Sequence, residues 1–141
     1  MNNFGELIVE MGLISLLSVM LLAAQIENGV DFTTSFPFYA GNTRMPAGSY
    51  KITPSGFDTS VLLIESKDRA YSTFVDFIPT QAEQPHSRSD VNFLKYGNTD
   101  FLNRIWVEGQ RYGMKVDPTK VELKAAAGTK AVEHSLVANK R

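Results

Sequence analysis

The sequence contains no cysteine, and this absence excludes several classes of protein at once. Without thiols there is no disulfide framework, no thiolate nucleophile and no cysteine-based metal site. Export remains compatible with the composition, because a chain of 141 residues that is 43% hydrophobic can build one core without covalent staples. The length indicates one domain, or one domain with an appendage.

Positive charge is missing from the first forty residues, although the whole chain has a net charge of only −1. That stretch has four acidic residues and no Lys or Arg, whereas residues 115–141 have six bases against three acids. The near-neutral total gives no electrostatic reason to expect nucleic acid as a partner. The opposite signs of the two ends suit head-to-tail association of copies, and ordinary solvated surface is the simpler explanation.

Sequence motifs that indicate catalysis or ligand binding are also missing. The sequence has no G-x-S-x-G, P-loop or G-x-G-x-x-G pattern and no N-x-S/T glycosylation acceptor. Its two histidines, His86 and His134, have no partners at ligand spacing, and a metal site needs three or four convergent ligands. We therefore expect a protein that is not an enzyme, with no catalytic residue, no cofactor and no bound metal.

The most apolar stretch, residues 11–29, supports more than one interpretation. Residues 13–22 have the length of the apolar part of a secretory signal peptide, with a cleavage position after Ala24, but no base precedes them. The run is short for a membrane span, which needs roughly 20 residues. A retained helix or an extended strand is equally open. We treat residues 1–29 as a signal-like segment or retained arm, followed by a domain of residues 30–141.

From residue 30 onward the chain is typical of a β protein, because short aromatic and β-branched runs alternate with Gly, Pro, Asn and Asp. Residues 59–66 indicate a central strand, and residues 91–96 and 101–109 indicate a hairpin. The longest polar interruption, residues 79–90, predicts a mobile loop. About seven such runs predict a mainly β fold, as an antiparallel β-sandwich or small barrel.

The C-terminal part predicts one short helix near residues 118–127. Asp117 is placed to cap it, Pro118 suits its first position, and Gly128 suits its end. The segment after that glycine alternates apolar and polar residues and predicts a final strand.

Two stretches, "FPFYAGNTRMPAGSYKI" and "FLKYGNTDFLNRIWVEGQRYGMKVDPTKVELKA", carry a resemblance to known proteins. Their spacing is similar to the patterns "PF.F..G...LPAG.Y.V" and "RYG..YFL..IW..G...G". In these patterns the chain resembles small exported acidobacterial-type β-sandwich proteins of unassigned function, over roughly residues 32–126. The matching positions include Pro46, Gly48 and Tyr50, and Met45 stands where the group has Leu. The resemblance implies export and a β fold, and it implies no enzymatic activity.

These observations lead to two functional hypotheses. The first is an extracytoplasmic structural or interaction protein (secreted, on the cell surface or in the periplasm), a self-assembling filament subunit that binds other copies of itself through its N-terminal arm. The residues expected to make those contacts are Leu7, Val9, Met11, Leu13, Leu16, Leu17, Met20 and Leu21.

The alternative is a soluble exported binding module for an apolar ligand or a glycan. Its candidate aromatic binding surface is Tyr96, Phe101, Trp106 and Tyr112, for which packing in the core is the simpler explanation. In both hypotheses nucleic acid is not a partner, and the membrane is met only during export or through a short N-terminal anchor.

Overall fold

The computed structural model describes residues 29–141. The predicted assembly arm, the signal-like segment and its cleavage position therefore lie outside the described residues, and those predictions stay predictions. Within the described part the chain is mainly β with one short helix, which confirms the mainly β character predicted from the short aromatic and β-branched runs.

Eleven strands and one helix make up the described chain. The strands are β1 (Val30–Thr34), β2 (Phe38–Ala40), β3 (Thr43–Met45), β4 (Gly48–Pro54), β5 (Val61–Ser66), β6 (Ser72–Gln81), β7 (Asp90–Tyr96), β8 (Thr99–Trp106), β9 (Tyr112–Val116), β10 (Val132–Val137) and β11 (Asn139–Lys140); the helix is α2 (Lys120–Ala126).

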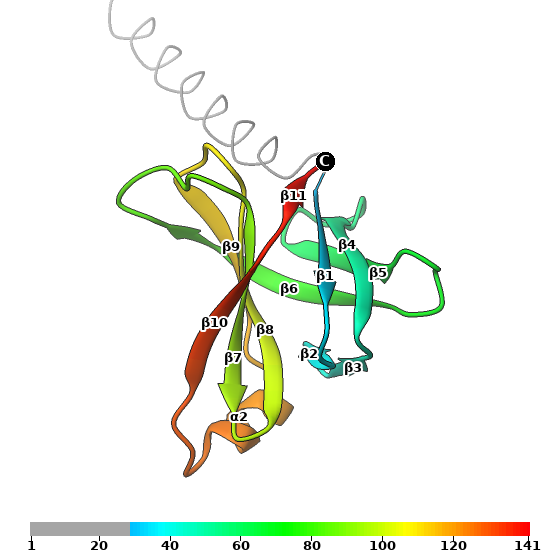
Figure 1. Cartoon of the computed structure of the whole chain (residues 1–141), viewed down its shortest axis with the longest axis vertical. Helices are drawn as coiled ribbons and strands as arrows, with labels where there is room; N and C mark the ends of the chain where they lie inside the picture. The colour runs from blue at the N-terminus through cyan, green and yellow to red at the C-terminus, as the bar shows by residue number, and fades with distance from the viewer. Residues whose placement is uncertain (1–28) are drawn as a thin grey trace, which may run out of the picture.

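The strands form one connected sheet with the order β10-β7-β8-β9-β6-β5-β4-β1-β11. Along this path all neighbours are antiparallel, and β2 adds a short parallel pairing to β8 that makes the sheet mixed. In Figure 1, β7, β8 and β10 lie on one side and β1, β4 and β5 on the other, with β6 running across between them. The first half of β6 pairs with β5 and its second half pairs with β9, so this strand belongs to both sides.

The two ends of the sheet come from consecutive pieces of the chain. β10 pairs with β7 and β11 pairs with β1, and only Ala138 separates them. The backbone N–H of Arg141 donates to the carbonyl of Gly29, which brings the C-terminus beside the start of β1 (Figure 1). The sheet is not closed, and the finer prediction of a seven-stranded sandwich or small barrel is not confirmed.

Alternating burial explains why these residues form strands around one core. In β5 every second residue is buried, and β1 and β4 show the same period, as expected when one face of a strand meets the core and the other meets water. β8 is buried on both faces through most of its length. The core includes aromatic residues that contact one another, among them Phe32, Phe38, Tyr50 and Phe93.

The predicted short helix is confirmed, but its capping was wrong. The residue at the N-cap position is Thr119, two residues after Asp117, and no side chain caps the helix. The Thr119 hydroxyl donates instead to the carbonyl of Gly41, at 3.3 Å, and so fastens the start of α2 to the β2–β3 turn. No helix among residues 29–141 is long and apolar enough to cross a membrane.

The polar stretch predicted as a loop over residues 79–90 is shorter and more tightly held than expected. β6 continues to Gln81, and the segment after it is pinned to the β8–β9 connection by backbone hydrogen bonds. The N–H of His86 donates to the carbonyl of Gln110, and the N–H of Gly109 donates to the carbonyl of His86.

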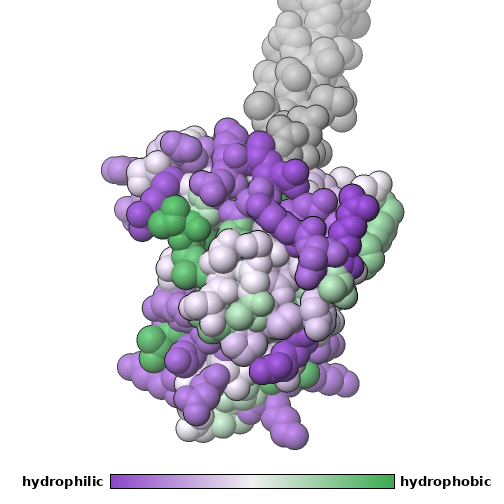
Figure 2. Space-filling model, turned by 45° about the vertical axis from the view of Figure 1, so that its right-hand side comes forward, coloured by the Kyte–Doolittle hydropathy of each residue, from purple (hydrophilic) through white to green (hydrophobic). Residues whose placement is uncertain are grey.

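Figure 2 shows that the apolar residues on the visible face lie in separate small patches on a mostly hydrophilic surface.

Candidate functional site

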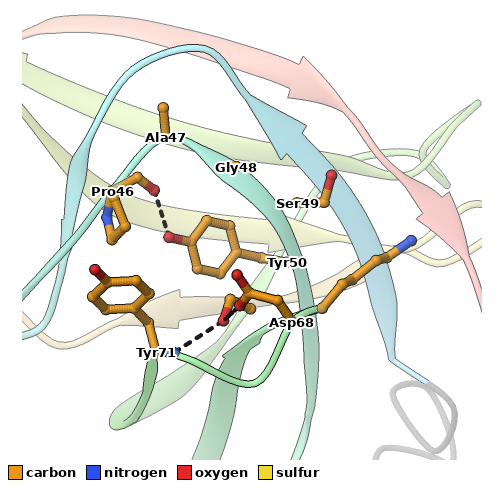
Figure 3. A pocket seen from close by; sticks show the side chains of 9 residues that line it. Pro46, Ala47, Gly48, Ser49, Tyr50, Asp68 and Tyr71 are labelled. Atoms are coloured by element: carbon orange, nitrogen blue, oxygen red, sulfur yellow. Dashed lines mark hydrogen bonds between the residues drawn. The ribbon is translucent and has the colours of Figure 1, made fainter.

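A pocket of about 270 Å³ lies between the β3–β4 turn and the β5–β6 turn (Figure 3). The register of β4 and β5, in which Tyr50 faces Ser66, brings these two turns together. The pocket is lined by Pro46, Ala47, Gly48, Ser49, Tyr50, Ser66, Lys67, Asp68 and Tyr71. We call this the two-tyrosine pocket.

The β3–β4 turn forms one wall of the two-tyrosine pocket. Gly48 has φ +156°, a backbone conformation that side chains rarely adopt, which explains a glycine between the turn and the strand. Tyr50 follows on β4 with its ring in the core, stacked on Phe32 at 5.6 Å between centroids. Its hydroxyl donates to the carbonyl of Pro46, and Figure 3 shows it pointing toward that turn.

The β5–β6 turn forms the opposite wall through the carboxylate of Asp68. Oδ1 of Asp68 accepts from the Ser66 hydroxyl at 2.6 Å and from the Ala70 N–H at 3.0 Å. The Ser66 hydroxyl in turn accepts from the Tyr71 N–H at 3.0 Å. These short local bonds cross-link the turn, and they leave the second oxygen of Asp68 without a hydrogen bond to another residue in the described structure.

Tyr71 and Lys67 complete the lining in different ways. The Tyr71 side chain is 48% exposed at the pocket, and its ring is available to a ligand. The ammonium of Lys67 lies 3.5 Å from Oδ2 of Asp31, a β1 residue that does not line the pocket. Asp68 is therefore the charged group of the lining that faces no opposite charge at salt-bridge distance in the described part of the chain.

Two pKa shifts follow from this geometry, and they have opposite directions. Burial raises the pKa of the Tyr50 hydroxyl, and the negative charge of Asp68 raises it further. The hydrogen bond from Ser66 lowers the pKa of the Asp68 carboxyl, with a further contribution from the Ala70 N–H. At neutral pH the pocket thus holds a firmly ionised carboxylate next to a firmly neutral phenol.

Two smaller pockets lie elsewhere on the described surface. One, of about 250 Å³, lies where β9 ends beside β6 and includes Phe74, Asp76 and Asp117. The other, of about 140 Å³, lies beside β2 and includes Tyr39, Arg44 and Asp100. Fewer side-chain hydrogen bonds join the lining residues of each of these pockets than join those of the two-tyrosine pocket.

The two histidines, expected to be surface or internally satisfied residues, each lie beside an aspartate and an aromatic ring. The His86 ring lies 4.2 Å from that of Trp106, and its Nε2 is 3.7 Å from Asp90. His134 Nε2 is 2.5 Å from Oδ1 of Asp100. No group of three or more His, Cys, Asp or Glu side chains among residues 29–141 is arranged to hold a metal ion.

The four residues of the predicted aromatic surface lie at separate places. Tyr96 and Phe101 contact each other, with ring centroids 5.8 Å apart, and Phe101 is buried. Trp106 is buried with its ring stacked on that of His86, and Tyr112 is half-exposed at the start of β9. None of the four lines the pockets described above. Their role in binding stays a prediction.

Sequence reasoning missed most of the two-tyrosine pocket. By its sequence, "KDRA" (residues 67–70) predicts only a turn, and Tyr71 predicts only one face of the strand that follows. Residues 46–50 predict a turn leading into a strand and carry part of the resemblance, but neither observation indicates a binding role. A Ser-x-Asp pair before a turn followed by an exposed tyrosine was the available local signal, because Ser and Asp at such positions fix turns through their side chains.

Comparisons of the chain with models of known protein families, with curated proteins and with solved structures found no match. The function is therefore inferred from the geometry of the site.

Proposed function

We propose that this protein is a non-enzymatic binding module that holds a small ligand, or one side chain of a partner, in the two-tyrosine pocket. The observation that carries the proposal is the ionised Asp68 carboxylate, fixed by Ser66 and Ala70 beside the exposed ring of Tyr71. A few fixed polar groups next to an aromatic surface are typical of ligand sites. The volume of about 270 Å³ suits a small ligand better than a drug-sized one.

The pKa directions favour binding over proton transfer. A general acid or base works best when its pKa lies near the operating pH. Here the pKa of Asp68 is lowered and that of Tyr50 is raised, so both groups are moved away from neutrality. Asp68 is suited to act as a constant negative charge.

An NMR panel tests this proposal on the full-length, ¹⁵N-labelled chain. The probes are n-butylammonium, n-butanol, butyrate and a neutral trisaccharide, each at the same concentration. We expect at least one probe to shift amide signals of residues 46–50 and 66–71 and to leave those of β7 and β8 unchanged. Shifts confined to other parts of the chain, or no shift from any probe, would overturn the proposal.

A second candidate function is the self-assembling extracytoplasmic subunit, and the sheet edges favour it. Within residues 29–141, β3 pairs only with β2 and β10 pairs only with β7, so each has one unpaired edge. β10 also exposes Val132 and Val137, at 63% and 56%. An exposed strand edge accepts an extended segment of another chain, and residues 1–24 are the segment proposed for this role when they are not removed by export.

Sedimentation velocity of the full-length chain tests the second candidate. Assembly through β10 predicts that Val137→Lys, which places a charge on the edge strand, abolishes species larger than the monomer. Val121→Lys, on the exposed side of α2, serves as the control and should assemble like the unmodified chain. A full-length chain that is monomeric at all concentrations tested would remove this candidate.

A further inference from the structure

We infer that the ligand of the two-tyrosine pocket carries a primary alkylammonium group, which sits between the carboxylate of Asp68 and the ring of Tyr71. This inference rests on the proposed function and names the chemical class of the ligand. It follows from which hydrogen-bonding groups of the pocket are already used and which remain free.

Three side-chain hydroxyl groups of the pocket are engaged within the protein. The Tyr50 hydroxyl donates to Pro46, and the Ser66 hydroxyl donates to Asp68. The Ser49 hydroxyl shares a hydrogen bond of 2.9 Å with Thr33. The side-chain donors left for a ligand are the hydroxyl of the half-exposed Tyr71 and the Lys67 ammonium, which lies 3.5 Å from Oδ2 of Asp31.

The carboxylate of Asp68, by contrast, has an oxygen that is free to accept hydrogen bonds from a ligand. Oδ2 of Asp68 takes part in neither of the two bonds that fix this carboxylate, since both go to Oδ1. A primary ammonium group has three donors and no acceptor, so it matches this free carboxylate oxygen and its negative charge together.

The aromatic ring of Tyr71 adds a second attraction for a cation. A cation within about 6 Å of a tyrosine ring centroid is attracted by the negative face of the ring. Tyr71 lies on the exposed side of the pocket, whereas the ring of Tyr50 is occupied by stacking on Phe32. The Lys67 ammonium, which is the other charged group of the lining, is engaged with Asp31 and so does not neutralise Asp68.

The same chemistry is available from two sources, a free amine or a lysine side chain of a partner protein. The probes are therefore n-butylammonium and the peptide acetyl-Gly-Lys-Gly-amide, with n-butanol as the neutral counterpart of the amine. For a probe this small we expect a dissociation constant of about 1 mM or weaker. If the peptide binds at least as tightly as butylammonium, a partner's lysine is the source, and if it binds more weakly, a free amine is.

Two matched pairs of variants test the inference in the full-length chain. Asp68→Asn retains an oxygen that can accept from Ser66 and Ala70 but removes the charge, and we expect binding of butylammonium to weaken about fivefold. Asp58→Asn is its control, because Asp58 fixes another turn through Ser60 in the same way and lines none of the three pockets described above. Tyr71→Ala should weaken binding about threefold, and Tyr112→Ala, which removes a similarly exposed tyrosine, should have no effect.

The readout is the titration of amide shifts at residues 46–50 and 66–71, recorded after the spectrum of each variant confirms an unchanged fold. Binding of butylammonium that is weakened by Asp68→Asn and not by Asp58→Asn supports the inference. Equal binding of butanol and butylammonium would overturn the inference and leave the proposed binding function standing. No shift from the ammonium probes, butanol, butyrate or the neutral trisaccharide would overturn both.

Discussion

The imidazole of His86 lies flat on the indole of Trp106, with ring centroids 4.2 Å apart and an angle of 7° between the planes. His86 comes from the β6–β7 connection and Trp106 from the end of β8. The stacking thus works together with the backbone hydrogen bonds between His86 and the β8–β9 connection. A long polar segment is held against the sheet in this way.

Replacing His86 with Ala should loosen this connection. Stacked aromatic pairs contribute about 1 kcal/mol beyond the area they bury, so we expect a loss of about that size in the free energy of unfolding. Trp106 is the single tryptophan of the chain, and its emission should shift to longer wavelength as the indole becomes exposed. Tyr112→Ala serves as the control; an unchanged emission maximum in His86→Ala would contradict the stacking.

A buried amide network should make β10 sensitive to a change in β7. Asn103 donates to Asn92 at 2.7 Å, and Asn92 donates to Glu133 and Ser135 of β10. Asn92→Ala leaves the amide of Asn103 buried without its acceptor, which costs about 1–3 kcal/mol. Chemical denaturation measures the loss, and the exposed Asn98→Ala provides the control.

The same network predicts a non-additive result. Once Asn92 is removed, the further change Asn103→Ala should cost much less than it does alone, because the interaction between the two amides is already lost. Fully additive free energies in the double variant would show that the two side chains do not act together.

The contact between Gly113 and Trp106 predicts a steric effect. A Cβ at position 113 would lie 2.6 Å from Cε3 of Trp106 and 2.7 Å from the carbonyl oxygen of Ile105. Gly113→Ala must therefore displace both the ring and the backbone, and we expect a loss of about 1–3 kcal/mol in the free energy of unfolding. Gly97→Ala is the control: it has free space around it and a positive φ, so about 1 kcal/mol is expected. A Gly113→Ala protein as stable as the unmodified chain would contradict the packing.

The pH dependence of stability should distinguish Asp90 from Asp58, because the pKa values of these two aspartates are shifted in opposite directions. Burial raises the pKa of Asp90, with His86 and Arg88 opposing the shift. A raised folded-state pKa means that stability from this group is present below the unfolded value near 3.8 and is lost as the pH rises through the folded value. Asp90→Asn should therefore be more stable than the unmodified chain at pH 7, with the difference becoming smaller toward pH 3.

Asp58 provides the opposite case. The backbone N–H of Ser60, helped by its hydroxyl, lowers the pKa of Asp58, so its contribution is present above the unfolded value and is lost as the pH falls through the folded value. Asp58→Asn should be less stable at pH 7, and its difference should also become smaller toward pH 3. Denaturation at a series of pH values measures both, and the same sign for the two variants would contradict these assignments.

Much of the fold was predictable from local patterns. The central strand at residues 59–66 and the hairpin at residues 91–96 and 101–109 were predicted from consecutive residues, and the structure confirms both as β5, between β4 and β6, and as the β7–β8 pair. The cap of α2 was not predictable, because the Thr119 hydroxyl bonds to Gly41, which is distant in the sequence. The connectivity of β10 and β11 to opposite ends of the sheet also depends on long-range pairing.

The candidate site could not be predicted from the sequence, because it also depends on long-range strand pairing. Its two walls are the turns after β3 and after β5, and the register between Tyr50 and Ser66 brings them together. Before that register is known, Asp68 is an ordinary turn aspartate and Tyr71 an ordinary strand tyrosine. Of the aromatic residues that the sequence pointed to, Phe101 packs between Tyr39 and Tyr96.

The most direct test of the central claim is the measurement of intermolecular NOEs in the full-length chain saturated with n-butylammonium. A ligand whose ammonium lies between Asp68 and Tyr71 predicts contacts from its methylene protons to the ring protons of Tyr71. NOEs to rings elsewhere, such as those of Phe74 or Tyr112, with none to Tyr71, would contradict the account.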